Sequence, residues 1–506
     1  MNSTDRWITR CPTLLRVDVA IPVLAYGLAT ALFHLAGFRM KMGWGSYQLL
    51  DREVLAEQPA QALWLLHGQP PALNALLAAS MKVSGASGVS VELVTRILFL
   101  FAGCFSAWLL FRILREVSGS LLVAALGVAI LVANPGFHYF ANRFFYPFPL
   151  QTLFLLWAWF TLRYLRDGRS ASLAGVASTL AAISLTRTLY PPVWAAVTFG
   201  TVLLGRVWVS GRLRWKADVA VGLALVALLA VWPAKNRALF GQYFSSSWAG
   251  YNLTLRLPVR SAERSMLNRY IRSGQYPMSV ERRFDAILPD ASDLQRRVLL
   301  GSKKSDGSRN WNHLVFVETD RALVRIGLRW RRQHPAHWLA RAVAYYAMWS
   351  RPTFVHPYEG HIRGPTGSLY QEYAAIWGSL FFADLRPLIE GVAPSLGFHE
   401  HARVLERRVP YTVFGLLFPV CLAAVALTVL RKQGSRDVRT AIAGILLLVL
   451  IWSVAVPCLT DGVEGNRMRF ATSPFLLVLI AYLVRAWSTQ RAKPRETPIP
   501  EGDLAR

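Results

Sequence analysis

Three acidic residues near the start of the chain are the first side chains that could do chemistry. Asp51, Glu53 and Glu57 lie in YQLLDREVLAEQPAQALW, shortly after an apolar run at 17–36. A carboxylate can act as a general base on a hydroxyl group or bind a divalent cation. Beside apolar segments it is costly unless it has such a partner. Because Asp51 lies nearest the apolar run, we predict that it is the catalytic carboxylate. A solvated loop position is the alternative for all three residues.

A polar corner follows in LLHGQPPALNALL, residues 65–77. Pro70 and Pro71 fix their own φ angles and move Gln69 out of the α region. The residues that follow can then begin a helix with proline in its first turn. We predict a rigid corner that directs His67 and Gln69 toward a substrate. The alternative is that the prolines only start a helix and that His67 lies at the surface.

Polar side chains also occur where other apolar runs end, in LTRTLYPP, WPAKNRALFGQYFSSSWAGYNL and the loop at 459–469. Cations at outward helix ends run against the usual charge bias, so they predict a phosphate or carboxylate partner. Ion pairs within the protein are the alternative. We predict that these side chains converge in an outward pocket and bind substrate: Arg187, Lys235, Asn252, Glu464, Arg467 and Arg469.

The elements that must position these residues are apolar helices. The chain of 506 residues is 54% hydrophobic. Apolar runs of roughly 17–25 residues, the length that crosses a bilayer, are expected near 17–36, 92–114, 119–139, 147–164, 171–187, 190–208, 217–234, 409–430, 440–458 and 470–488. The segments 72–84 and 373–394 are candidates for additional or interfacial helices. The predicted fold is an all-α polytopic membrane protein of about 10–12 transmembrane helices with a long extracytoplasmic loop region.

The net charge of +27 follows membrane topology rather than nucleic-acid binding. With the N-terminus in the cytoplasm, the short basic segments between spans all fall on the inside, as the positive-inside rule requires. These segments include Arg112 and Arg115, Arg163 to Arg169, and Arg431 to Arg439. We therefore predict a multi-pass protein of the bacterial plasma membrane with both termini in the cytoplasm and no nucleic-acid partner.

This topology divides the chain into four regions. They are a transmembrane bundle at 1–234 with a catalytic first outer loop at 37–91, an extracytoplasmic region with amphipathic helices at 235–408, C-terminal transmembrane helices at 409–490, and a disordered cytoplasmic tail at 491–506. The four cysteines have no metal-like spacing. No HExxH, P-loop, GxSxG, CxxC or dinucleotide motif is present, which argues against a pump or a cytoplasmic nucleotide-sugar enzyme.

Four stretches, taken in order, resemble the family 39-like group of membrane glycosyltransferases with the GT-C fold. The group includes protein mannosyltransferases, the aminoarabinose transferase of lipid A and RgtA/B/C/D-like bacterial proteins. The stretches are YQLLDREVLAEQPAQALWLLHGQPPALNALLAA, WPAKNRALFGQYFSSSWAGYNL, RWRRQHPAHWLARAV and EGNRMRFATSPFLLVL.

The resemblance implies transfer of a sugar from a polyprenyl-phosphate donor to a glycan, lipid or protein acceptor on the extracytoplasmic face, usually with inversion. Asp51 matches the first-loop acid, which would act as general base or help to hold a divalent cation. Arg187, Lys235, Arg467 and Arg469 are candidates to stabilise the departing lipid phosphate.

The chain departs from the family where relatives carry a second acid, because it has NRFFYPFPL there, with Arg143 and Tyr146. No cofactor is predicted with certainty; a divalent cation stays open, as does a metal-independent mechanism. Two other functions also stay open: a transporter or lipid flippase, and a non-catalytic homologue that serves envelope assembly.

Overall fold

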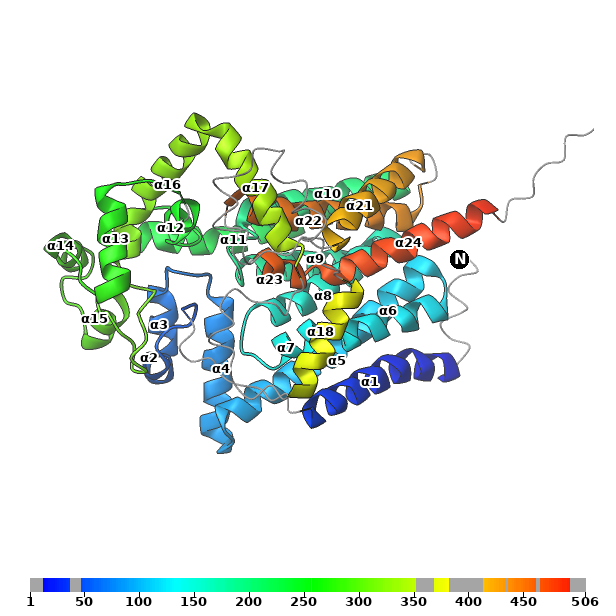
Figure 1. The fold of residues 1–506 in the computed structure, drawn as a ribbon, viewed down its shortest axis with the longest axis horizontal. Helices are drawn as coiled ribbons and strands as arrows, with labels where there is room; N and C mark the ends of the chain where they lie inside the picture. Colours follow the sequence, from blue (N-terminus) through cyan, green and yellow to red (C-terminus); the bar gives the residue numbers. More distant parts are fainter. Residues whose placement is uncertain are drawn as a thin grey trace, which may run out of the picture.

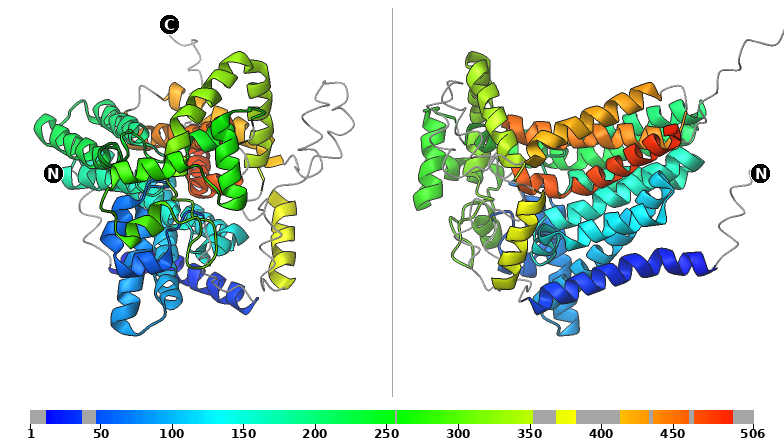
Figure 2. Two further views of the ribbon diagram at one scale, coloured as in Figure 1. Left: turned by 90° about the vertical axis from the view of Figure 1, so that its left-hand side faces the viewer. Right: turned by 45° about the vertical axis from the view of Figure 1, so that its right-hand side comes forward.

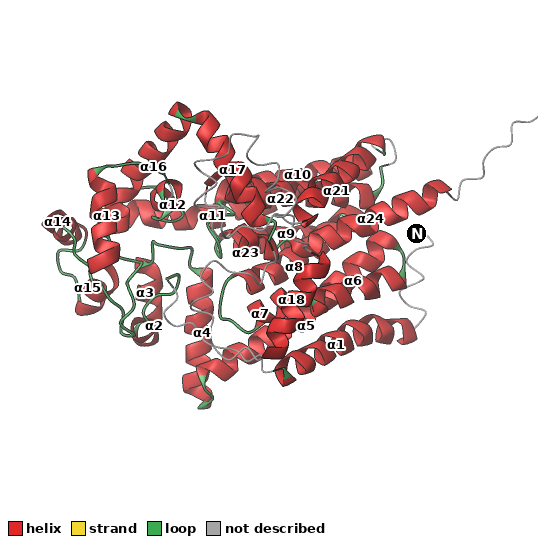
Figure 3. Ribbon diagram, in the orientation of Figure 1, coloured by secondary structure: helices red, strands yellow, loops and turns green. Residues whose placement is uncertain are grey.

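The computed structural model describes residues 12–36, 47–255, 257–351, 368–381, 413–432, 436–460 and 465–491. These residues form 22 helices joined by loops, and apart from an isolated bridge between Lys303 and Arg309 they contain no β-structure (Figure 3). The prediction of an all-α protein is confirmed.

Six of the described helices are long and apolar enough to cross a membrane. They are α1 (Pro12–Leu35), α5 (Val91–Ser118), α10 (Pro192–Ser210), α11 (Trp215–Phe240), α21 (Val413–Arg431) and α22 (Val438–Thr460). A seventh span results if α6 (Leu121–Ala133) and α7 (Pro135–Ala141), which are bent by 61° at their junction, are counted together. The chain is therefore a polytopic membrane protein.

Three helices that the sequence predicts as spans lie outside this group: α8 (Pro147–Asp167), α9 (Ser170–Ser184) and α24 (Ser473–Arg491). The apolar parts of α9 and α24 are shorter than 18 residues. Helix α8 is largely buried by neighbouring helices and carries polar side chains inside the bundle; Gln151 donates to the backbone oxygen of Phe470 at 3.0 Å. These helices complete the bundle by packing rather than by apolar length.

The long helices run side by side, and a group of shorter helices covers one end of them (Figures 1 and 2). This group contains α2 (Arg52–Glu57), α3 (Pro59–Leu65), α12 (Ala249–Thr254), α13 (Ala262–Ser273), α14 (Met278–Ile287), α15 (Asp293–Leu299) and α16 (Val315–Gln333). The start of α1 and the end of α24 lie at the opposite end of the bundle.

Between the bundle and the covering group lie the remaining helices. They are α4 (Ala72–Ser87), α17 (Pro335–Trp349), α18 (Ser368–Phe381) and the short helix α23 (Gly465–Phe470). Helix α17 packs against α22 and α23. Helices α16 and α17 meet at a break between Gln333 and Pro335.

The end of the bundle away from the covering helices is basic and internally paired. Arg112 and Arg115 both form ion pairs with Asp18. Arg439 donates to the backbone oxygen of Glu116 at 3.0 Å, and Arg485 to that of Ser118 at 3.0 Å. Basic segments that the charge pattern assigns to one membrane side therefore lie at one end of the molecule.

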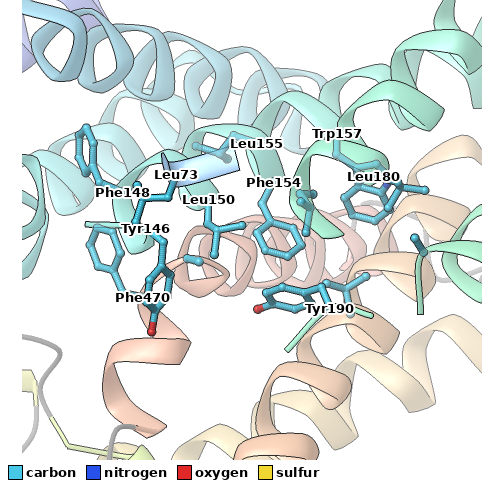
Figure 4. Close-up of a cluster of buried hydrophobic side chains, with 14 of the residues drawn as sticks. Leu73, Tyr146, Phe148, Leu150, Phe154, Leu155, Trp157, Leu180, Tyr190 and Phe470 are labelled. Atoms are coloured by element: carbon cyan, nitrogen blue, oxygen red, sulfur yellow. The ribbon is translucent and has the colours of Figure 1, made fainter. Parts of the chain in front are cut away.

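An aromatic core runs along α8 (Figure 4). The ring of Phe154 lies 4.9 Å from that of Tyr190 and 5.8 Å from that of Phe475, centroid to centroid. Tyr146 and Phe470 lie at one end of this core, and the Tyr146 hydroxyl points away from the apolar side chains. The core therefore ends at a tyrosine whose polar group is directed out of it.

Helices α12 and α16 pack closely because Gly250 lies against the α16 backbone, where a Cβ would collide with Asp320 and Leu323. The Gly250 amide donates to Asp320 Oδ1 at 2.6 Å. Asp320 is buried, and burial raises the pKa of its carboxyl to about 6. The contact therefore holds the two helices together around a carboxylate that is unfavourable when charged.

Asp320→Asn is expected to raise stability above pH 6, because Asn keeps the acceptor for Gly250 and removes the buried charge. The folded carboxyl pKa of about 6 exceeds the unfolded value near 3.8, so the wild type loses stability as pH rises through this window. The expected increase in the free energy of unfolding is about 3 kcal/mol at pH 8 and about half of that at pH 5. Thermal unfolding of the detergent-solubilised variant and wild type at the two pH values measures it; an equal gain at both would contradict the assignment.

Candidate functional site

The polar corner at 65–68 is held by side chains from distant parts of the chain. Asn312 Oδ1 accepts from the amides of His67 and Gly68 at 2.8 and 2.9 Å, and Asn312 Nδ2 donates to the oxygen of Leu65 at 3.2 Å. Lys235 Nζ donates to the oxygen of Leu66 at 2.5 Å. The backbone of the corner is therefore fixed from two sides.

Two serines complete this arrangement, which we call the loop clamp (Lys235, Ser246, Ser247 and Asn312). Ser246 Oγ donates to the oxygen of Gly68 at 2.5 Å, and the Ser247 amide donates to the oxygen of His67 at 3.0 Å. The serine run of WPAKNRALFGQYFSSSWAGYNL thus binds the corner directly.

His67 is fully buried beside the clamp. Its Nδ1 shares a hydrogen bond of 2.7 Å with Ser247 Oγ, and its Nε2 has no partner among the described residues. Burial and the positive charge of Lys235 hold the pKa of His67 well below 6.5, so the imidazole is neutral. The surface alternative for His67 is wrong; its contact with substrate stays a prediction.

Gly68 lies where no side chain fits. A Cβ there would lie 2.9 Å from Trp248 Nε1 and 3.0 Å from the oxygen of Trp311, two atoms that are themselves hydrogen-bonded at 2.9 Å. The corner can therefore approach the two tryptophans only as glycine.

Gly68→Ala is expected to destabilise the fold by about 1–3 kcal/mol, the usual cost of overpacking a buried site. The folded yield and thermal unfolding temperature in detergent measure the effect. Gly85→Ala is the matched control, because a Cβ at Gly85 meets nothing within 4 Å. Equal losses for the two variants would show that Gly68 does not lie against the tryptophans.

A small cavity of about 10 Å³ lies beside the corner, room for roughly one water molecule. Gln69 is buried and lines it together with Tyr47, Trp248 and Trp311. The Tyr47 ring lies 5.7 Å from that of Trp248 and 6.0 Å from that of Trp311. The ring of Tyr47 therefore lies beside the polar corner, and its hydroxyl group is left to bind a second partner.

That hydroxyl belongs to a second group, which we call the arginine–tyrosine cluster (Tyr47, Tyr146, Arg187 and Arg467). Arg467 Nη2 donates to the Tyr47 hydroxyl at 3.0 Å. The Arg187 guanidinium lies 4.2 Å from the Tyr146 ring centroid, and that of Arg467 lies 5.3 Å from it. Both arginines are buried, at 7% and 3% exposure. Residues from three separate loops and from helix α23 thus meet in one place.

Arg187 has no compensating anion within the part of the chain that the structure describes. It takes part in none of the ion pairs there, and its buried Nε has no hydrogen-bond partner. A buried cation beside a neutral ring is costly, because the ring does not replace lost hydration. This position favours a bound anion.

Arg469 points away from Arg467 although both lie on α23. It donates to the backbone oxygens of Ser350 and Arg351 at 3.1 and 2.5 Å, and its guanidinium lies over the ring of Phe414. Its contacts therefore join α23 to the end of α17 and the start of α21, outside the arginine–tyrosine cluster.

Asp51 lies at the N-cap of α2, where its Oδ1 accepts from the Glu53 amide at 3.0 Å. Ser305 donates to the same carboxylate twice, from its amide to Oδ2 and from its hydroxyl to Oδ1, both at 2.7 Å. Asp51 follows Tyr47 by four residues, so their Cα atoms are at most about 14 Å apart. The Asp51 carboxylate joins α2 to the 300–310 loop, and among the described residues it makes no hydrogen bond or ion pair with the arginine–tyrosine cluster.

The other predicted residues fall elsewhere. Asn252 lies in α12, where its backbone amide donates to the oxygen of Trp248 at 2.9 Å. Glu53 lies in α2, exposed, and Glu57 forms an ion pair with Arg297. Glu464 lies outside the described residues, and so do the start of the first outer loop, most of 352–412 and the tail after Arg491.

The outer corners also touch through the backbone, since the amide of Ala72 donates to the oxygen of Leu185 at 2.8 Å. The Pro-Pro corner therefore lies against the segment that carries Arg187. Among the described residues, no three His, Cys, Asp or Glu side chains lie close enough to hold a metal ion.

Four residues of this region are not predicted by the sequence: Tyr47, Ser246, Ser247 and Asn312. The sequence signal for Asn312 is slight, a WNH triplet in a polar loop 245 positions after His67. Ser246 and Ser247 belong to a run of three serines, which gives no sign of the partners that they bind at 67–68.

No protein-family model matches the sequence, and no curated protein matches it. Among solved structures, the chain is similar to ArnT from Cupriavidus metallidurans bound to undecaprenyl phosphate, with 16% identity and a TM-score of 0.32. The match covers 89% of this chain and 77% of that one. A TM-score this low does not establish a shared fold.

Proposed function

We propose that this protein transfers a sugar from a polyprenyl-phosphate-linked donor to an envelope glycan, lipid or protein acceptor, at the end of the bundle that carries the covering helices. One observation carries the proposal. Two buried arginines, Arg187 and Arg467, lie beside Tyr146 and Tyr47 at the end of a lipid-spanning bundle. Guanidinium groups bind phosphate oxygens with bidentate geometry, and tyrosine hydroxyls can donate to them.

The chemistry assigns each group one task. Asp51 accepts the proton from the acceptor hydroxyl as its oxygen attacks the anomeric carbon, and the bond between that carbon and the phosphate oxygen breaks. The polyprenyl phosphate leaves with the bonding electron pair. Arg187 and Arg467 stabilise the charge that develops on the leaving phosphate, which is where electrostatic help lowers the barrier most.

The loop clamp supports this arrangement by position. It fixes residues 65–68, whose neighbour Gln69 lines the cavity next to Tyr47. A site that must hold reacting groups within a fraction of an ångström needs such rigid backing. Lys235 and His67 serve here by positioning the corner.

The proposal is tested with the full-length protein reconstituted in liposomes that contain polyprenyl-phosphate-linked sugars from a bacterial lipid extract. Mass spectrometry is expected to show loss of the lipid-linked sugar and appearance of free polyprenyl phosphate when an envelope acceptor fraction is added. Movement of intact lipid-linked sugar between leaflets without its consumption would identify a flippase instead. No consumption and no movement would favour the non-catalytic assembly role.

A further inference from the structure

A second polar site lies on the surface where α11 ends. A cavity of about 460 Å³, within the usual range for small-ligand sites, is lined by Arg237, Gly241, Gln242, Tyr243, Asp320, Arg321 and Val324. None of these side chains belongs to the loop clamp or to the arginine–tyrosine cluster. The cavity is therefore a separate site.

Its place along α11 puts it at the lipid headgroups. Leu223 and Val231 are 65% and 59% exposed on this apolar helix, as lipid-facing side chains are. Arg237 follows Val231 by six residues, about 9 Å along the helix axis. Tyr243 is 75% exposed, and tyrosine is enriched at the membrane–water interface. The cavity thus opens where headgroups lie rather than into bulk water.

The lining carries both signs of charge; Arg237 donates to the backbone oxygen of Gly241, but none of the charged lining side chains has an ion-pair partner among the described residues. Arg237, Arg321 and Asp320 take part in no ion pair there. Asp320 Oδ1 accepts from the Gly250 amide, and no donor among the described residues binds its other oxygen. The Arg237 guanidinium lies 5.8 Å from the ring centroid of Tyr243. Such a site suits a ligand that has an anionic and a cationic group of its own.

We propose that this cavity binds the headgroup of a phospholipid of the phosphoethanolamine class. Arg237 and Arg321 hold the phosphate, and the ammonium group binds the second oxygen of Asp320 and the face of Tyr243. An anionic headgroup without an amine is repelled by Asp320. A trimethylated amine cannot donate hydrogen bonds to that oxygen. A buried carboxylate that lowers the stability of the apoprotein is retained here because it binds ligand.

The test uses the full-length protein in detergent and native mass spectrometry with dioctanoyl phosphatidylethanolamine, phosphatidylglycerol and phosphatidylcholine. The wild type is expected to bind phosphatidylethanolamine at least tenfold more tightly than the other two. Soluble glycerophosphoethanolamine is expected to compete, whereas inorganic phosphate at the same concentration is not. Equal affinity for the three lipids, or equal competition by inorganic phosphate, would overturn the proposal.

Variants separate the two halves of the headgroup. Arg321→Gln is expected to weaken phosphatidylethanolamine binding about tenfold, and Asp320→Asn to bring its affinity to within about twofold of that for phosphatidylglycerol. Asn keeps the acceptor for Gly250, so the helix contact survives. Arg325→Gln is the matched control, one helical turn farther along α16, exposed and outside the cavity. If Arg325→Gln weakens binding as much as Arg321→Gln, the attraction is to the charged helix face alone and the proposal fails.

Discussion

Arg187→Gln is expected to lower sugar transfer by about 10²–10³-fold, the usual effect of removing one charge-stabilising donor at a developing anion. The variant should fold, because its side chain loses a buried charge and no hydrogen bond of the described residues. Its affinity for polyprenyl phosphate should fall as well, since the product carries the phosphate that the guanidinium binds. Initial rates of lipid-linked sugar consumption and a binding titration with polyprenyl phosphate measure the two effects.

Arg143→Gln is the matched control for this experiment. Arg143 also lies over a tyrosine ring, that of Tyr139 at 4.6 Å, but outside the arginine–tyrosine cluster. Its rate should stay within a few-fold of the wild type. Arg467→Gln should resemble Arg187→Gln, and the double variant should lose less than the product of the two, since both arginines act on one phosphate. Unchanged phosphate affinity in Arg187→Gln would remove the anion site from the proposal.

Asp51→Asn is expected to lower the transfer rate by about 10²–10⁴-fold, the typical contribution of a general base. Its affinity for polyprenyl phosphate should stay unchanged, because the carboxylate acts on the acceptor hydroxyl and not on the phosphate. Asn retains an oxygen that can cap α2 and accept from Ser305, so the fold is preserved. Single-turnover rates with the acceptor fraction in excess measure this change.

Ser305→Ala separates catalysis from anchoring. It removes the 2.7 Å hydroxyl contact to Asp51 and leaves the amide contact in place, so we expect less than a tenfold change in rate. If Asp51→Asn transfers sugar as fast as the wild type, the carboxylate serves only to join α2 to the 300–310 loop. A large loss in Ser305→Ala would mean that loop position, not proton transfer, limits the reaction.

Long apolar runs predicted the six span-length helices, but they also predicted three spans at α8, α9 and α24 that lie outside this group. Helices α5, α11 and α22 lie where the hydrophobic runs predict them, because no other environment satisfies both their side chains and their backbone. Helix α8 was predicted as a span at 147–164, but it is not among the helices long and apolar enough to cross a membrane. Its Gln151 lies inside the bundle and is satisfied by a backbone oxygen 319 residues away, a partner that composition cannot reveal.

Part of the candidate site was also predicted from the ends of the apolar runs. Arg187 and Arg467 were singled out as cations next to apolar runs, and the structure brings both beside Tyr146. The sequence could not show that Arg469 binds elsewhere. The direction of a side chain on the short helix α23 depends on which neighbouring segments pack against that helix. Asn312 was missed, since an asparagine in a polar loop gives no sign of the backbone groups that it will bind.

The loop clamp has a consequence for synthesis of the protein in the cell. The backbone of His67 is fixed by Ser247 and Asn312, which follow it by 180 and 245 residues. At about 5–20 residues per second, the ribosome needs on the order of 10–50 s to add that much chain. During this interval the Pro-Pro turn emerges without its anchors, while the apolar helices α5, α10 and α11 are still being synthesised. Assembly factors that shield exposed polar loops would act on the nascent chain in this interval.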